Sequence, residues 1–266
     1  MKAVISDILT VVKCPVTGAD LKYKDNHLES ENGAIYNIND GIVDLVAKSD
    51  SDSQLKTEIS YDSLSQNKYD RIVGNGLFLR LVWGFDKKKI SVFPEFAGVI
   101  PDGIVLDVPC GTGLYNIEAY ERKSTSIFIA LDYSLGMLKM ARKKCLEAGV
   151  ENVVFVRGDV SNLPFKDKSI NGCISLNGFH VFPNPSQGAM EIGRTLMTDA
   201  PMIMTVACSE ERMFSDFMIK NVMIPRGFFN NKLPRSTYQK MLIKANFGNF
   251  EVQMFGAIML AKCIQK

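Results

Sequence analysis

Two aspartates follow neighbouring apolar runs, where carboxylates can bind a ligand. Asp107 ends the first run and is followed by a turn that contains Gly111 and Gly113. Asp132 ends the next run, 19 residues after Gly113. Two glycines let the backbone turn sharply and approach a ligand closely, and a carboxylate at the second position can accept both hydroxyls of a ribose. The pattern predicts a site for a ligand that contains a nucleoside.

The third position of the glycine motif separates two classes of ligand. A dinucleotide site needs Gly-x-Gly-x-x-Gly, because the third glycine allows tight helix packing beside the pyrophosphate. In this chain that position is Asn116. A ligand with a nucleoside and no phosphates therefore fits better, and S-adenosylmethionine is such a ligand. A dehydrogenase is the more remote alternative.

The elements that must position these residues alternate in type. Continuous apolar runs typical of doubly buried strands cover residues 104–108, 126–131, 153–156, 173–176 and 202–207. Helical spacing of apolar residues follows Ser134 and ends before Gly149, and it recurs at 189–196 and, behind Ser236, at 238–245. This alternation predicts a doubly wound α/β sheet. Two closing runs, 250–255 and 257–263, predict a last strand that doubles back antiparallel.

Four ordered motifs resemble those of the class I S-adenosylmethionine-dependent methyltransferases, especially the group that includes ubiquinone and menaquinone biosynthesis enzymes. The resemblance covers roughly residues 101–266 and implies a Rossmann-like, mostly parallel sheet of seven strands, with S-adenosyl-L-methionine as cofactor. It departs from the family at Pro109, where many members have glycine, and at 198–201, where a Lys-Pro-Gly-Gly turn is usual. The motifs are Leu106 to Gly113, Leu131-Asp132-Tyr133-Ser134 with Met137-Leu138, Arg157-Gly158-Asp159-Val160 with Leu163-Pro164-Phe165, and Asn177-Gly178-Phe179-His180.

The same resemblance implies roles for single residues. Asp132 binds the ribose, while the Asp159 carboxylate and the Val160 backbone N–H bind the adenine. His180, after the fourth strand, is expected near the transferred methyl group, either as general base or to orient the substrate. The expected cofactor-binding residues are Tyr69, Asp107, Pro109, Cys110, Gly111, Gly113, Asp132, Tyr133, Met137, Asp159, Val160 and Asn177.

The first 47 residues are expected to form a separate small domain. They resemble a degenerate version of the zinc-binding domain that precedes some ribosomal-RNA guanine methyltransferases, through Cys14-Pro15 and Tyr36 to Ile42. The family's second metal cysteine would fall at Thr17, and His27 alone cannot make a site. Because a structural zinc site needs four ligands, we expect no metal.

Composition and the remaining segments narrow the function. We expect residues 48–100 to form a linker and helical cover, and the Met- and Phe-rich insertion 209–235 of the 101–266 domain to form a lid. A formal charge of +2 over 266 residues gives no long-range field toward nucleic acid or an anionic membrane. With no run of about 18 apolar residues, we expect a cytoplasmic protein that does not insert into membranes. The low net charge and the apolar insertion favour a small, partly apolar methyl acceptor over RNA. A non-catalytic protein that binds S-adenosylmethionine is the other alternative. The sequence does not predict the oligomeric state.

Overall fold

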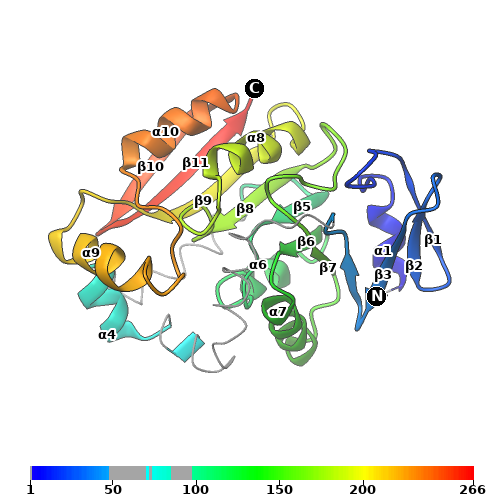
Figure 1. The fold of residues 1–266 in the computed structure, drawn as a ribbon, viewed down its shortest axis with the longest axis horizontal. Coiled ribbons are helices and arrows are strands. Elements are labelled where there is room, and N and C mark those ends of the chain that lie inside the picture. The colour runs from blue at the N-terminus through cyan, green and yellow to red at the C-terminus, as the bar shows by residue number, and fades with distance from the viewer. Residues whose placement is uncertain (1, 48–69, 72–73, 85–97) are drawn as a thin grey trace.

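One mixed sheet runs through the whole molecule. The computed structural model describes residues 2–47, 70–71, 74–84 and 98–266. Its described strands form an eleven-stranded sheet in the order β1-β2-β3-β4-β7-β6-β5-β8-β9-β11-β10 (Figure 1). The expectation of a seven-stranded sheet is therefore wrong for the sheet as a whole, because strands from the N-terminal residues extend one edge.

The central strands are parallel and almost completely buried, as the continuous apolar runs predict. β11 lies antiparallel between β9 and β10, which confirms that the last strand doubles back. The parallel strands are β5 Ile104–Asp107, β6 Ile127–Asp132, β7 Val153–Arg157, β8 Gly172–Leu176 and β9 Pro201–Ala207, and the antiparallel pair is β10 Phe247–Phe255 and β11 Ile258–Gln265.

Helices cover both faces of this sheet, which confirms the doubly wound arrangement. α6 Ile117–Arg122 and α7 Leu135–Ala148 pack into one apolar layer. α8 Pro185–Thr195 and α10 Arg235–Lys244 pack into the other.

Two predicted helix starts have different outcomes. α7 has the predicted ends, because the Ser134 side chain accepts the Met137 N–H and Gly149 is left-handed at φ 73°. The predicted cap at Ser236 is wrong. α10 begins at Arg235, so its N-cap position is Pro234, two residues before Ser236, and the extended backbone of Pro234 ends the preceding loop.

The N-terminal residues join the α/β part through backbone pairing and a shared core. β4 pairs in parallel with β7, while β1, β2 and β3 continue the sheet antiparallel. Buried Ile8 and Leu28 belong to the same hydrophobic cluster as Val156 and Phe165 of the α/β part. The elements are α1 Lys2–Ile8, β1 Leu21–Lys24, β2 His27–Ser30, β3 Ile35–Asn39 and β4 Ile42–Asp44.

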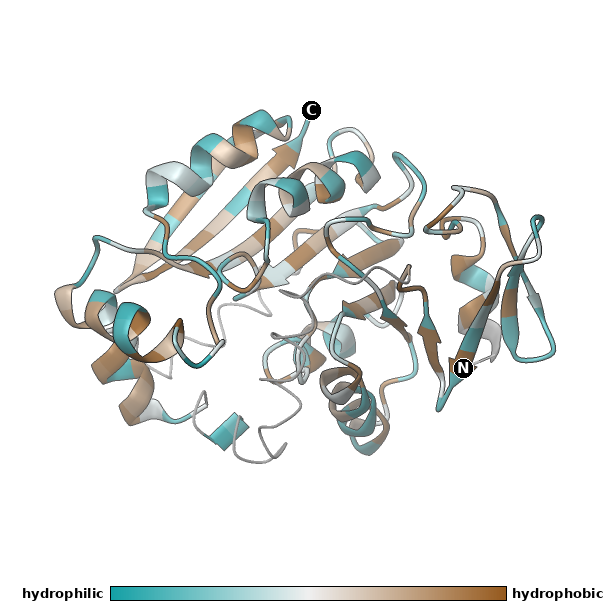
Figure 2. Cartoon of the chain, viewed as in Figure 1, coloured by the Kyte–Doolittle hydropathy of each residue, from teal (hydrophilic) through white to brown (hydrophobic). Residues whose placement is uncertain are grey.

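A cover of short helices lies beyond the end of β9, and it consists of α4 Gly76–Phe78, η1 Leu79–Trp83, α9 Met213–Met218 and η3 Ile219–Met223 (Figure 1). Ser215 Oγ donates to the Val82 carbonyl, and the Ala257 N–H donates to the Trp83 carbonyl at 2.8 Å. The cover is rich in apolar residues (Figure 2). Among the described helices, none combines the length and apolar character that crossing a bilayer requires.

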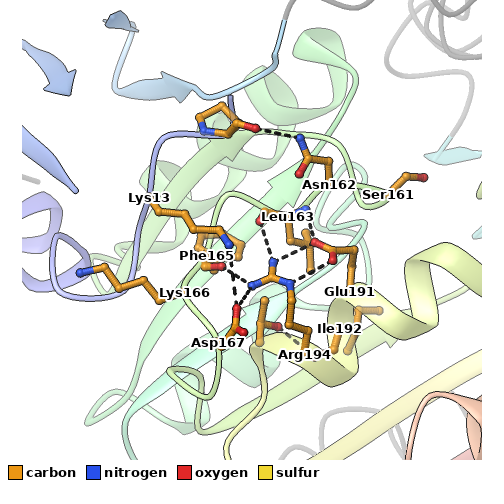
Figure 3. A network of polar contacts seen from close by, with 12 residues as sticks. Lys13, Ser161, Asn162, Leu163, Phe165, Lys166, Asp167, Glu191, Ile192 and Arg194 are labelled. Carbon is orange, nitrogen blue, oxygen red and sulfur yellow. Dashed lines mark hydrogen bonds and ion pairs between the residues drawn. The ribbon is translucent and has the colours of Figure 1, made fainter. Parts of the chain in front are cut away.

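Arg194 of α8 fixes the loop that follows β7. Its guanidinium donates to the carbonyls of Leu163 at 3.0 Å and Phe165 at 2.8 Å (Figure 3). It also pairs with Glu191 at 2.8 Å and with Asp167 at 2.5 Å. Because Glu191 in turn accepts the Leu163 N–H at 2.9 Å, α8 holds this loop firmly from one side.

Candidate cofactor and active site

The carboxyl ends of β5 and β6 bring the glycine turn and the second carboxylate together. The Gly111 N–H donates to Asp132 Oδ2 at 2.9 Å, and the Ser134 N–H donates to Asp132 Oδ1 at 2.9 Å. These bonds fix the orientation of a carboxylate that is 8% exposed. The glycine turn and Asp132 therefore lie in contact in the structure, as a shared ligand site requires.

The two glycines of the turn have different surroundings. Gly111 has a φ of 53°, and a Cβ placed on it would meet no described atom within 4 Å. Gly113 has a φ of 73°, and its Cβ would lie 3.1 Å from Cδ1 of Ile117. Gly111 thus leaves open space beside Asp132, which fits close approach of a nucleoside ligand, whereas Gly113 allows tight packing of the loop.

Asp107 lies beneath the turn. It is fully buried, and its Oδ2 accepts hydrogen bonds from Asn116 Nδ2 at 2.5 Å and from the Tyr120 hydroxyl. Burial raises the pKa of this carboxyl to about 7. Its Oδ1 has no hydrogen-bond partner among the described residues. Asn116 occupies the position of the third glycine in a dinucleotide motif, and its side chain anchors the loop.

Cys110 and Pro109 lie within the same turn. Cys110 is buried, and its N–H donates to the Leu131 carbonyl at 2.9 Å, which ties the turn to β6. A cis peptide joins Pro109 to Val108. A Cβ on Gly178, which follows β8, would lie 2.4 Å from Pro109 Cδ. The turn is therefore packed against both neighbouring strand ends.

The residues expected at the adenine and beside the ribose lie after β6 and β7. Asp159 Oδ1 accepts the Ser161 N–H at 2.8 Å and shapes a tight turn, in which Val160 is buried. Met137 is also buried, in the first turn of α7. The Tyr133 carbonyl accepts a hydrogen bond from Nε of Arg157 at 3.0 Å. These contacts give the loops a defined shape next to Asp132.

Asn177 follows β8 in a left-handed conformation, at φ 58°. Its N–H donates to the Thr205 carbonyl at 2.9 Å, and the Thr205 hydroxyl donates to its Oδ1 at 3.3 Å. Asparagine tolerates this backbone better than most residues. This left-handed position belongs to the fourth motif and is one of the expected cofactor-binding residues.

A polar contact that the motifs did not reveal joins Asp70 to the glycine turn and to α7. Thr112 Oγ1 donates to Asp70 Oδ1 at 2.6 Å, and the ammonium of Lys144 on α7 pairs with the same carboxylate. Tyr69, one of the expected cofactor-binding residues, lies outside the described residues. A carboxylate next to an aromatic residue is the only sequence signal for Asp70.

His180 is the expected residue near the reaction centre, and it is buried in an aromatic stack. Its ring lies on Phe229 with 3.9 Å between centroids, and Phe229 stacks on Trp83 at 5.8 Å. Burial lowers the pKa of His180 to about 3. Its Nδ1 accepts the Ala207 N–H at 3.4 Å, so the ring is neutral and carries its proton on Nε2. This arrangement suits hydrogen-bond donation better than proton acceptance.

Comparison with known proteins agrees with this geometry. Residues 105–199 match the family model described as a methyltransferase domain. An uncharacterized chloroplastic methyltransferase of Arabidopsis thaliana is 27% identical over 179 residues, which are 64% of this chain and 51% of the relative. A demethylmenaquinone methyltransferase of Lactiplantibacillus plantarum is 36% identical over 101 residues, 37% of this chain and 43% of the relative. The chain thus spans about half the length of these relatives.

A solved structure shares the fold. Geranyl diphosphate methyltransferase, in complex with GPP and sinefungin, superposes with a TM-score of 0.61 at 11% identity, over 80% of this chain and 100% of that one. Residues 105–199 thus match a methyltransferase domain, and the described sheet has the Rossmann-like α/β fold of the solved structure; the cofactor that the family match implies is S-adenosyl-L-methionine. The open turn at Gly111 and the oriented Asp132 carboxylate fit that cofactor. The resemblance of the N-terminal residues to a zinc-binding domain stays an expectation.

Proposed function

We propose that this chain is an enzyme that transfers the methyl group of S-adenosylmethionine directly to a small, partly apolar molecule. One observation carries the proposal: the Gly111 turn and the Asp132 carboxylate are joined at 2.9 Å at the carboxyl edge of the sheet. Ligands of open α/β sheets bind at this edge. The insertion 209–235 follows β9 in the chain, and its Phe229 stacks on His180 beyond β8.

The cofactor supplies a methyl group that is already activated by the positive charge of a sulfonium. The protein then has to hold donor and acceptor in line and exclude water. We assign Asp132 to the ribose hydroxyls and the 159–160 turn to the adenine. Asp107 and Asn116 keep the glycine turn rigid from below.

The insertion 209–235 and the net charge support the proposed class of methyl acceptor. Buried Ile219, Met223 and Phe229 give the insertion an apolar inner side, which favours an apolar acceptor over a polyanion. A formal charge of +2 supports the same choice. Because the His180 ring is neutral with its proton on Nε2, we propose that it orients a polar atom of the acceptor as a hydrogen-bond donor.

The test is methyl transfer from S-adenosylmethionine with a labelled methyl group. The purified chain is incubated in parallel with a metabolite extract and with total RNA from the same cells. Label in small molecules that partition into organic solvent supports the proposal, and label in RNA contradicts the acceptor class. Binding of the donor with no transfer to either fraction would identify a non-catalytic binding protein.

A further inference from the structure

We infer that the N-terminal unit, residues 2–47, positions the adenosine side of the cofactor site through two tethers, Asp44 to Arg157 and Pro15 to Asn162. The inference rests on the proposed function only for the identity of the ligand. Both tethers end on loops that leave the carboxyl edge of the sheet, the Tyr133 loop after β6 and the Asp159 loop after β7.

The first tether starts from strand register. β4 pairs in parallel with β7 so that Asp44 lies opposite Arg157, and β7 pairs with β6 so that Arg157 lies opposite Asp132. One residue from each of these strands thus forms a row across the sheet. The row ends at the carboxylate assigned to the ribose.

The Arg157 side chain connects the residues of this row by polar contacts. Arg157 Nη1 lies 3.2 Å from Asp44 Oδ2, and Arg157 Nε donates to the Tyr133 carbonyl at 3.0 Å. The guanidinium also lies over the Tyr133 ring, 5.5 Å from its centroid. The planar guanidinium therefore contacts Asp44 of the N-terminal unit and the loop between Asp132 and Ser134 at the same time.

The second tether holds the adenine loop. Asn162 Nδ2 donates to the Pro15 carbonyl at 3.0 Å (Figure 3). The Asn162 N–H donates to the Asp159 carbonyl at 3.0 Å, so the same residue closes the turn that carries Asp159. Loss of the Pro15 contact therefore frees a residue that shapes the site.

Backbone bonds extend this second contact. The Lys13 N–H donates to the Pro164 carbonyl at 2.9 Å, and the Lys166 N–H donates to the Val11 carbonyl at 2.8 Å. Arg194 holds the same loop from α8. The loop after β7 is therefore clamped between α8 and the N-terminal unit, and its freedom depends on both.

An ion pair between the same two parts of the chain offers a matched control. Lys166 Nζ lies 2.6 Å from Asp20 Oδ1, with side chains 36% and 67% exposed. Neither charged group takes part in the two tethers, which join Asp44 to Arg157 and Pro15 to Asn162. Asp20→Asn removes an attraction between the N-terminal unit and the loop, as Asp44→Asn does, but leaves both tethers intact.

The experiment uses the full-length chain with Asp44→Asn, Asn162→Ala or Asp20→Asn. Calorimetry gives the Kd for S-adenosylmethionine and for adenosine, and chemical unfolding gives the stability of each variant. We expect Asp44→Asn and Asn162→Ala each to raise both Kd values by about three- to tenfold, the effect of one lost hydrogen bond. Asp20→Asn should leave both Kd values unchanged. The adenosine readout matters because a defect confined to the methionine part would not change it.

The outcomes separate this inference from the proposed reaction. Unchanged Kd values in folded Asp44→Asn and Asn162→Ala overturn the inference alone, as does an equal loss in Asp20→Asn. Binding by the unaltered chain without methyl transfer overturns only the reaction. Failure of the unaltered chain to bind either ligand overturns both.

Discussion

Replacing His180 with asparagine should remove a pH dependence that its burial creates. In the folded chain, burial lowers the pKa of this histidine to about 3, whereas an unfolded histidine has a pKa near 6.5. Between these values the unfolded chain binds a proton that the folded chain excludes. The contribution of the neutral His180 ring to the free energy of unfolding is therefore fully present above pH 6.5 and is lost as the pH falls below it.

The size of this loss follows from the two pKa values. At pH 5, about 1.5 units below the unfolded pKa, the wild type should have lost about 2 kcal/mol of unfolding free energy relative to pH 7.5, at 1.36 kcal/mol per unit. His180→Asn keeps an acceptor for the Ala207 N–H but does not titrate. Loss of the stacking on Phe229 lowers the free energy of unfolding of the variant by an amount that does not change with pH.

Urea unfolding of both proteins at several pH values between 5 and 7.5 measures the effect. The stability difference between wild type and His180→Asn should change by about 2 kcal/mol over this range. Other titrating groups cancel in the difference. Parallel curves for the two proteins would show that His180 titrates in the fold as it does in the unfolded chain, which would refute its burial as a neutral ring.

Three further outcomes are expected. Asp107, with its pKa raised to about 7, should destabilise the wild type relative to Asp107→Asn by about 3 kcal/mol as pH rises from 4 to 7; unfolding curves at both pH values check this, and no pH-dependent difference would contradict it. Arg194→Lys should cost about 2–3 kcal/mol of stability because carbonyls of the clamped loop lose their donors, whereas Arg122→Lys, in an exposed helical pair, should change stability by less than about 0.5 kcal/mol. Protein purified without a metal-binding tag should contain no stoichiometric zinc by elemental analysis, and zinc that disappears in Cys14→Ser would contradict this.

Part of the fold follows directly from local sequence. Strands buried on both faces must be apolar throughout, so the runs from β5 to β9 are visible without any knowledge of their partners. α7 is also predictable, since Ser134 and Gly149 give start and stop signals within a few residues of the helix. The glycine turn and Asp132 can likewise be recognised from short stretches of the sequence.

The N-terminal pairing is a different kind of information. β4 spans Ile42–Asp44, and its partner β7 begins more than one hundred residues later. A strand of three residues has too little sequence pattern to indicate which strand it pairs with. Pairing at the edge of a sheet also depends on which strand has a free edge in the folded protein. The eleven-stranded sheet and the Asp44 tether therefore could not be read from the sequence.

The site also contains contacts that depend on tertiary packing. Asn116 is informative in the sequence only as an absent glycine, yet its side chain holds Asp107. The stack of Phe229 on His180 joins residues 49 positions apart in the chain. The effect of this stack on the histidine, through desolvation, is invisible until the cover is placed over it.

S-adenosylmethionine binding to the wild type and to two glycine variants tests the central claim most directly. Gly111→Ala and Gly149→Ala both put a methyl group on a left-handed residue with open space around its Cβ, so their backbone strain is comparable, about 1–2 kcal/mol each. Only Gly111 adjoins Asp132. Calorimetry in the presence of a chelator should show one cofactor bound per wild-type chain, affinity lowered at least about tenfold in Gly111→Ala because the methyl group occupies the space for the ligand, and unchanged affinity in Gly149→Ala. No binding of S-adenosylmethionine or S-adenosylhomocysteine by the wild type, or equal affinities in the two variants, would contradict the account.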